Sequence, residues 1–144
     1  MYREISAWID SVLERRVPEG VGAFCFNIYA DDWDNWSMEL IGAEAYDPRD
    51  PDWPCYEVTD MGSRSHLFRW EESVGWHQTV REMSKYIVRY LAEGAHATAL
   101  QPADVVAVAF VSGVPQVLWK KKYRKKRPTA LVGCFLCETQ PLVW

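Results

Sequence analysis

Two short runs of alternating side chains constrain the fold of this chain more than any other feature of its sequence. The run AFCFNIYA, residues 23–30, places Phe24, Phe26 and Ile28 on one side of an extended strand, and WSMELIG, residues 36–42, alternates in the same way. The five residues between the runs have the length and polar composition of a hairpin loop. The sequence therefore predicts an antiparallel pair of strands as the start of a sheet.

Helical periodicity lies on either side of this hairpin. Residues 5–12 place four apolar side chains on one helical stripe, and VPEGVG then ends the predicted helix with proline and glycine. Residues 71–94 space five apolar side chains, from Trp76 to Leu91, by three or four positions, with acidic residues at the start and Gly94 near the end. The sequence thus predicts two main helices.

The remaining segments alternate between irregular and strand-like patterns. Three prolines in YDPRDPDWPCYEVTD exclude a helix there and predict either a long irregular connection or an edge segment over residues 44–63. HLFRW is compatible with a short strand and DVVAVAFV, residues 104–111, with a buried one, while SG at 112–113 predicts a tight turn into PQVLWK. TALVGCFLCETQ, residues 129–140, could add one more strand.

The order of these segments predicts an α+β domain, because strands and helices come in separate runs. We expect an antiparallel sheet of four to six strands with the two main helices packed on one face. Residues 1–119 are expected to form this single domain, since the composition changes sharply afterwards. Residues 120–144 comprise a basic segment and a possible extra strand, or an extension appended to the fold.

Hydropathy indicates the environment of the chain. No run of about 18 uncharged apolar residues occurs, and the amino-terminal MYREISAWIDSVLERR is charged where a secretory signal requires an apolar centre. We therefore expect a cytoplasmic protein without a membrane partner. Disulfides are disfavoured in that compartment, so Cys25, Cys55, Cys134 and Cys137 are expected to be free buried thiols.

Charge is distributed unevenly along the chain. Residues 1–119 contain nineteen acidic and nine basic residues, whereas residues 120–144 contain seven basic residues and one acidic residue. Clustered Lys and Arg can neutralise phosphates, so nucleic-acid binding is one hypothesis for the basic segment, and a solvated charged link is the other. All seven bases lie in KKKYRKKR; they are Lys120, Lys121, Lys122, Arg124, Lys125, Lys126 and Arg127.

Metal and catalytic motifs are incomplete. A calcium loop starting at Asp32 would need an oxygen ligand, a glycine and a glutamate where the chain has Trp36, Ser37 and Ala43. The C-x-x-C at residues 134–137 lies in an apolar strand pattern without a second close Cys or His pair. We therefore expect no metal, no cofactor and no catalytic residue, although a small hydrolase that uses a carboxylate pair stays open as an alternative.

An acidic segment with tryptophans is the strongest candidate for recognition. Residues 31–60 contain ten acidic residues and one basic residue, together with Trp33, Trp36 and Trp53. Trp36 belongs to a predicted strand with alternating side chains and is expected in the core. For the loop residues Trp33 and Trp53, both exposure and burial are possible. Aromatic anchors within a charged rim are typical of protein interfaces. The predicted partner-binding face consists of Asp31, Asp32, Trp33, Asp34, Asp50, Asp52, Trp53, Glu57 and Asp60.

The composition and order of segments also give the chain a family resemblance. FCFNIYADDWDNWSMELIGAEAYDPRDPDWPCYEVTD, followed by FRW, the second helical pattern and VVAVAFVSGVPQVLW, resembles small bacterial immunity proteins of polymorphic and contact-dependent toxin systems. The resemblance covers residues 1–120 and implies a non-enzymatic protein that binds one cognate toxin domain, often a basic nuclease, and occludes its active site. Acidic loops would then mimic phosphate. The basic segment 120–127 departs from this pattern.

Overall fold

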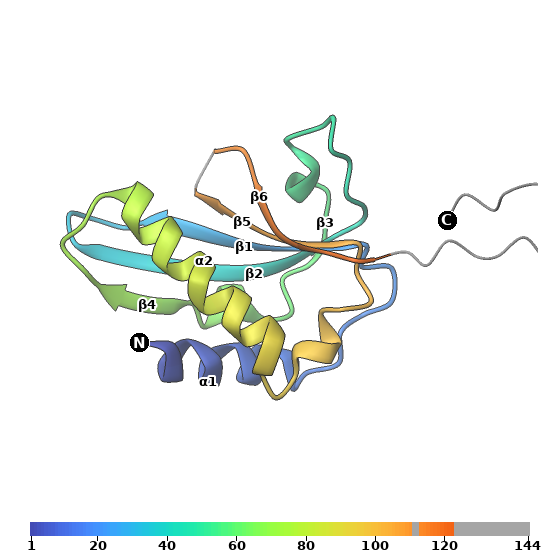
Figure 1. Cartoon of the computed structure of the whole chain (residues 1–144), viewed down its shortest axis with the longest axis horizontal. Coiled ribbons are helices and arrows are strands. Elements are labelled where there is room, and N and C mark those ends of the chain that lie inside the picture. Colours follow the sequence, from blue (N-terminus) through green and yellow to red (C-terminus); the bar gives the residue numbers. More distant parts are fainter. Residues whose placement is uncertain (111–112, 123–144) are drawn as a thin grey trace, which may run out of the picture.

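The computed structural model describes residues 1–110 and 113–122, which form two α-helices and a six-stranded sheet (Figure 1). The predicted α+β class is therefore confirmed. The helices are α1 (Tyr2–Leu13) and α2 (Trp76–Glu93), and short 3₁₀ turns occur at Trp53–Cys55, Ser63–Ser65 and Ala97–Ala99. The strands are β1 (Ala23–Ala30), β2 (Asn35–Ala43), β3 (Glu57–Thr59), β4 (Phe68–Glu71), β5 (Val105–Phe110) and β6 (Gln116–Lys120).

The sheet is mixed, and this corrects the predicted antiparallel arrangement. Its strand order is β3-β2-β1-β5-β6, and β4 pairs with β2 as well. The predicted hairpins β1–β2 and β5–β6 are antiparallel, but β1 and β5 run parallel. A parallel pair needs a long crossover, and α2 lies in the connection that brings the chain back alongside β1. Local alternation identified both hairpins, whereas their relative direction depends on this long-range connection.

One large core joins the helices to the sheet. Phe24, Phe26 and Ile28 of β1 belong to the same buried cluster as Ile9 of α1 and Ile87 of α2. α1 buries the stripe that the periodicity predicted, and α2 buries the later part of its predicted stripe, Met83, Ile87 and Leu91. Packing therefore supplies most of the stability of both helices.

The second helix begins later than the sequence pattern suggested. Its first residue is Trp76, and the acidic residues expected at its start, Glu71 and Glu72, belong to β4 and to the connection that follows. No acidic residue occupies the first turn of α2. Trp76 itself is 45% exposed, so it is not the core residue that the predicted stripe implied.

A smaller cluster lies on the alternate side chains of the same strands. Ala23, Cys25, Ile41 and Ala107 are among the residues that pack there around Trp53, which reaches the sheet from the connection after β2. The small side chains leave room for an indole ring. Cys25 is buried as expected, and burial raises the pKa of its thiol. Cys55 is exposed, which corrects the expectation of burial, and both thiols are free.

The connection 44–67 returns along the free side of β2. Between β3 and β4, a tight turn places Met61 and Gly62 at positive φ, 52° and 77°, and carries Ser63 to the strand. The Ser63 hydroxyl donates to the Leu40 carbonyl at 2.8 Å and accepts from the Leu40 amide at 3.0 Å. Ser63 therefore satisfies the edge of β2 between its two short partner strands.

The last described strand reaches one residue beyond the expected domain boundary at residue 119, since β6 ends at Lys120. The possible strand 129–140 and the C-x-x-C lie outside the described residues, as do Arg124, Lys125, Lys126 and Arg127. Within the part of the chain that is described, no helix is both long enough and apolar enough to cross a bilayer.

Candidate functional site

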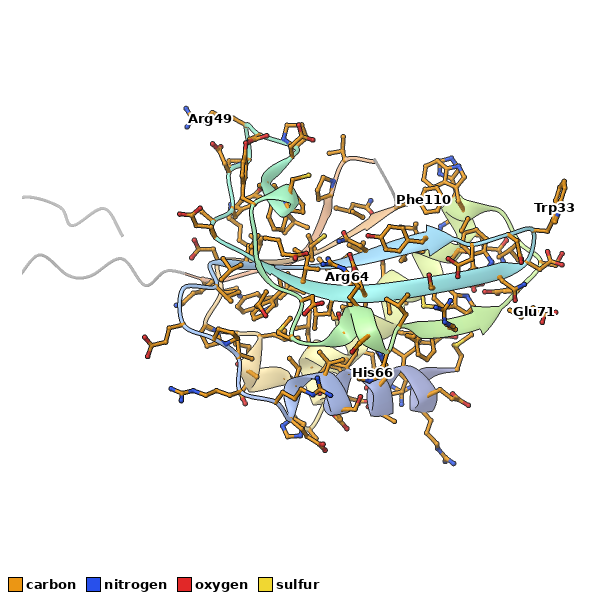
Figure 2. The ribbon with its side chains drawn as sticks, turned by 180° about the vertical axis from the view of Figure 1, so that it is seen from behind. Trp33, Arg49, Arg64, His66, Glu71 and Phe110 are labelled. Carbon is orange, nitrogen blue, oxygen red and sulfur yellow. The ribbon has the colours of Figure 1, made fainter. Side chains whose placement is uncertain are left out.

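The predicted partner-binding face is divided between the two ends of β2. Asp31, Asp32, Trp33 and Asp34 form the loop before this strand, whereas the other five predicted residues follow it. Nine strand residues extend over roughly 30 Å, and Figure 2 shows Trp33 at one end of the molecule and Arg49, from the later connection, at the other. The structure therefore replaces one predicted face with two separate acidic regions.

The first region, residues 31–34, is named here the acidic hairpin tip. The backbone amides of Asp31 and Asp32 donate to the Asn35 carbonyl at 2.8 and 3.4 Å, and the Asn35 side-chain amide donates to Asp32 at 2.6 Å. These bonds close the loop tightly on the strand that follows. Trp33, at its apex, is 96% exposed (Figure 2). The loop thus holds a large aromatic side chain in solvent on an ordered backbone.

Neighbouring elements fix the base of the tip. Asp31 accepts hydrogen bonds from Ser37 at 3.0 Å and from Arg69 at 3.4 Å, and the Asp34 carbonyl accepts from the Glu72 amide at 2.8 Å. Asp31 is therefore partly neutralised, whereas Asp34 has no ion-pair partner within the described ranges.

A hollow of about 410 Å³ opens at this base. Arg69 already pairs with Asp31 in this lining, so Asp32 is the carboxylate left to pair with a further cationic side chain, which could also lie against an indole. The residues that line it are Asp31, Asp32, Asn35, Trp36, Arg69 and Trp70.

In the second region, residues 44–60, the side chains mainly make contacts that stabilise the fold of the segment. Trp53 is only 3% exposed and meets Tyr46 edge to face at 5.7 Å, so it is removed from the predicted partner-binding face. Asp50 accepts a bond from the Asp52 amide at 2.9 Å, and its carbonyl accepts from the Trp53 amide at 3.2 Å. Asp50 thus shapes the turn that delivers Trp53 to the sheet.

Arg64 pairs with two further acids of the predicted face. Its guanidinium lies 2.5 Å from Glu57 and 4.0 Å from Asp60, and it also pairs with Glu39 at 2.9 Å. The strong pairing with Glu57 and Glu39 raises the pKa of Arg64. Two acids of the predicted face are therefore occupied by an internal cation rather than presented to a partner.

Glu39 is a buried carboxylate that the sequence reasoning did not single out. It accepts hydrogen bonds from Asn27 at 3.2 Å and Tyr29 at 2.7 Å on the neighbouring strand, in addition to Arg64. Burial by itself would raise the pKa of Glu39, but the bonds from Arg64, Tyr29 and Asn27 outweigh it, so this pKa lies below its ordinary value. Burial and the bond to Glu39 raise the pKa of Tyr29.

A signal for this cluster exists in the sequence. Asn27 and Glu39 face each other directly in the β1–β2 register, and a hairpin centred on the predicted loop places them opposite. Two polar residues at paired positions, within strands that are mainly apolar, indicate a network on one side of the sheet. The polar side chains of this network form hydrogen bonds with one another. Such an arrangement is typical of a network that stabilises the fold.

Three residues of the basic segment are described. Lys120 lies with its ammonium 5.8 Å from the Tyr46 ring centroid, and Lys121 donates to the Pro102 carbonyl at 3.4 Å. These contacts attach Lys120 and Lys121 to the domain, and Lys122 is exposed.

Neither metal-ligand geometry nor comparison with known proteins assigns a function to these residues. In the ranges 1–110 and 113–122, no group of three His, Cys, Asp or Glu side chains is placed to share a metal ion. Comparison with protein-family models, curated proteins and solved structures found no match.

Proposed function

We propose that this chain is a non-enzymatic, cytoplasmic binding protein of the immunity type, which neutralises a cognate bacterial toxin by occluding its active site. The acidic hairpin tip is the docking element in this proposal. The observation that carries it is Trp33, which is 96% exposed between acidic residues on a loop fixed by hydrogen bonds. A tryptophan held in solvent on an ordered backbone is the kind of anchor that dominates protein interfaces.

The charge of the tip specifies the chemistry of the partner. Asp32 and Asp34 flank Trp33 in the sequence, and the hollow at the base of the tip, where Asp32 lies, would receive a lysine or arginine of the partner. Negative potential accelerates encounter with a basic surface and disfavours acidic ones. A nuclease toxin carries such a basic surface because it binds phosphate, so the tip would occupy the site of the nucleic-acid backbone. The resemblance to immunity proteins supports the same direction.

Capture of the partner tests the proposal. The full chain serves as bait in lysate of the source cell, before and after nuclease treatment and in low and high salt. We expect retention of one protein with a basic domain that survives nuclease treatment, and inhibition of that protein's toxic activity by the purified chain. Recovery of nucleic acid alone, released by salt, would assign the function to the basic segment instead.

Two matched substitutions locate the interface. Trp33→Ala removes the anchor at the tip, and Tyr56→Ala removes an exposed aromatic residue at the opposite end of β2. We expect W33A to weaken binding of the captured partner by about tenfold or more, and Y56A to leave it unchanged. Equal affinity of W33A and the unmodified chain would remove the tip from the interface.

A further inference from the structure

An apolar groove lies between α2 and the β5–β6 hairpin, apart from both acidic regions. It has a volume of about 820 Å³, with Val108 and Phe110 of β5 in its floor. The Trp76 ring stacks on Phe110 with centroids 5.1 Å apart and planes within 7°. Val88 on the helix and Val114 on the hairpin are exposed, the latter by 78%. These side chains form an apolar surface that is open within the described part of the chain.

The helix side of the groove carries a basic row. Residues four apart lie on one face of a helix, so His77, Arg81 and Lys85 form a line beside the apolar line of Trp76 and Val80. All three basic residues line the groove. Arg81 and Lys85 have no ion-pair partner among the described residues, so their charges are available to an occupant.

The groove and the acidic hairpin tip lie at the same end of the molecule. Phe110 is paired with Ile28 in the parallel register of β5 and β1, two residues before the strand ends and leads into Asp31. Figure 2 shows Phe110 and Trp33 toward the same end of the ribbon. One end of the chain therefore carries both an acidic aromatic projection and a basic apolar groove.

We propose that the occupant of this groove is the acidic hairpin tip of a second copy of the chain. Trp33 would lie against Trp76 and Phe110, while Asp32 and Asp34 would pair with Arg81 and Lys85. The tip and the groove lie at the same end of the molecule. Two copies related by a two-fold axis can therefore each insert the tip into the groove of the other, and the assembly closes as a dimer.

The surface area that this contact would bury is small for a protein interface. Two tryptophans bury roughly 300–500 Å², and stable interfaces bury about 1,200–2,000 Å² in total. The dimer is therefore weak and reversible, and it forms at high local concentration. It also hides Trp33, so self-association competes with any partner that uses the same ring. The dimer itself requires no such partner and stands independently of the proposed function.

Sedimentation of the full chain over a concentration series up to about 1 mM tests the proposal. We expect a monomer–dimer equilibrium that high salt weakens, and a loss of affinity of about tenfold for W33A. The double variant R81E/K85E should weaken it similarly. R3E/R16E makes the same charge change at exposed positions on and just after α1, outside the groove, and should leave the dimer intact.

A charge exchange identifies the pairing directly. D32N/D34K replaces the two acidic charges that flank Trp33 by one positive charge, while Asp31 keeps its pairing with Arg69 and Asn at position 32 can still accept the bond from Asn35. This variant and R81E/K85E should each be monomeric alone, since their tips and grooves no longer attract. Mixed together, the two variants should form a heterodimer, because the altered tip meets the altered groove and the unaltered tip meets the unaltered groove.

Three results would overturn the proposal. They are a chain that stays monomeric throughout the series, a dimer indifferent to both tip and groove variants, and a dimer that is lost only when Lys120, Lys121 and Lys122 are changed to Gln. The last result would place the basic segment in the contact. Partner capture by R81E/K85E separates the two proposals, because the toxin interface needs the tip and not the groove.

Discussion

Two short stretches that each place a tryptophan beside aspartates differ in the burial of that tryptophan. DDWDNW at the acidic hairpin tip and DPDWPC in the second acidic region each set a tryptophan among aspartates. Trp33 in the first points into solvent, whereas Trp53 in the second is buried against the sheet. The aspartates beside each tryptophan therefore did not determine whether its side chain is exposed. The surface on which the indole can pack determined it.

The difference has a structural cause. Trp53 begins a 3₁₀ turn with Pro54 directly after it, and this turn folds over strand positions occupied mainly by alanines and Cys25. Those small side chains leave a space that an indole fills. The tip projects beyond the ends of β1 and β2, and its indole stays 96% exposed because it does not pack on the described part of the chain.

The first prediction concerns the buried member of the pair. Trp53→Ala removes the largest side chain from the smaller core cluster and leaves a cavity between the connection and the sheet. We expect the free energy of unfolding to fall by about 3–5 kcal/mol, measured by denaturant titration. A loss below about 1 kcal/mol would mean that the connection relaxes to fill the space. Trp53 and Trp33 would then differ in exposure but not in their contribution to stability.

Alternation and helical periodicity were sufficient for much of the fold. The two strand runs, the stripe of α1 and the buried strand 105–110 follow from side chains that must alternate or recur to reach one core. The parallel pairing of β1 with β5 did not follow, because no local pattern records which strands meet after a crossover. The start of α2 was also misplaced, since the acids before Trp76 imitate a helix terminus.

The candidate site was predictable in composition and not in geometry. The sequence located the acidic segment and Trp33, yet its residues separate because β2 runs between them. Glu57 and Asp60 were assigned to a partner, but Arg64 pairs with both from a short turn that has no periodic signal. The groove beside α2 combines residues from helix and hairpin, and only the folded chain brings these together.

The second prediction sharpens the contrast between paired and presented acids. Arg64→Ala leaves Glu39 as a buried carboxylate with two neutral donors, Asn27 and Tyr29. We expect a loss of about 1–3 kcal/mol at neutral pH, toward the lower end because both donors remain. A neutral result from chemical denaturation would show that the buried carboxylate of Glu39 does not need Arg64, and the contrast between paired and presented acids would lose its support.

The third prediction is a pH dependence with a defined sign. The pKa of Glu39 lies below its ordinary value of 4.5, so its contribution to stability is complete above that value and is lost as the pH falls through the folded pKa. Without Arg64, burial raises this pKa, and the carboxyl is protonated more easily. The penalty of R64A should therefore shrink on acidification, measured as the difference in unfolding free energy from the unmodified chain. A constant difference would contradict the assignment of Glu39 as the affected group.

The fourth prediction concerns how the second region is held to the sheet. Ser63→Ala removes the hydroxyl that donates to and accepts from the backbone of Leu40, and leaves both backbone groups buried without that partner. We expect a loss of about 1 kcal/mol and faster amide exchange at Leu40. Ser65→Ala is the matched control, because its hydroxyl bonds only to the nearby Gly62 carbonyl and is exposed. Equal effects of the two substitutions would deny Ser63 its role at the strand edge.

The smallest expected change in stability belongs to the exposed tryptophan. Trp33→Ala removes a ring that packs against nothing in the described chain, so unfolding should shift by no more than about 0.5 kcal/mol. The same substitution should remove the component of tryptophan fluorescence that acrylamide quenches most readily in dilute solution, where the chain is monomeric. A clear destabilisation would show that Trp33 supports the hairpin. Neutral stability together with loss of that component would identify a ring whose large apolar surface has no role in folding, and binding would then be its remaining physical use.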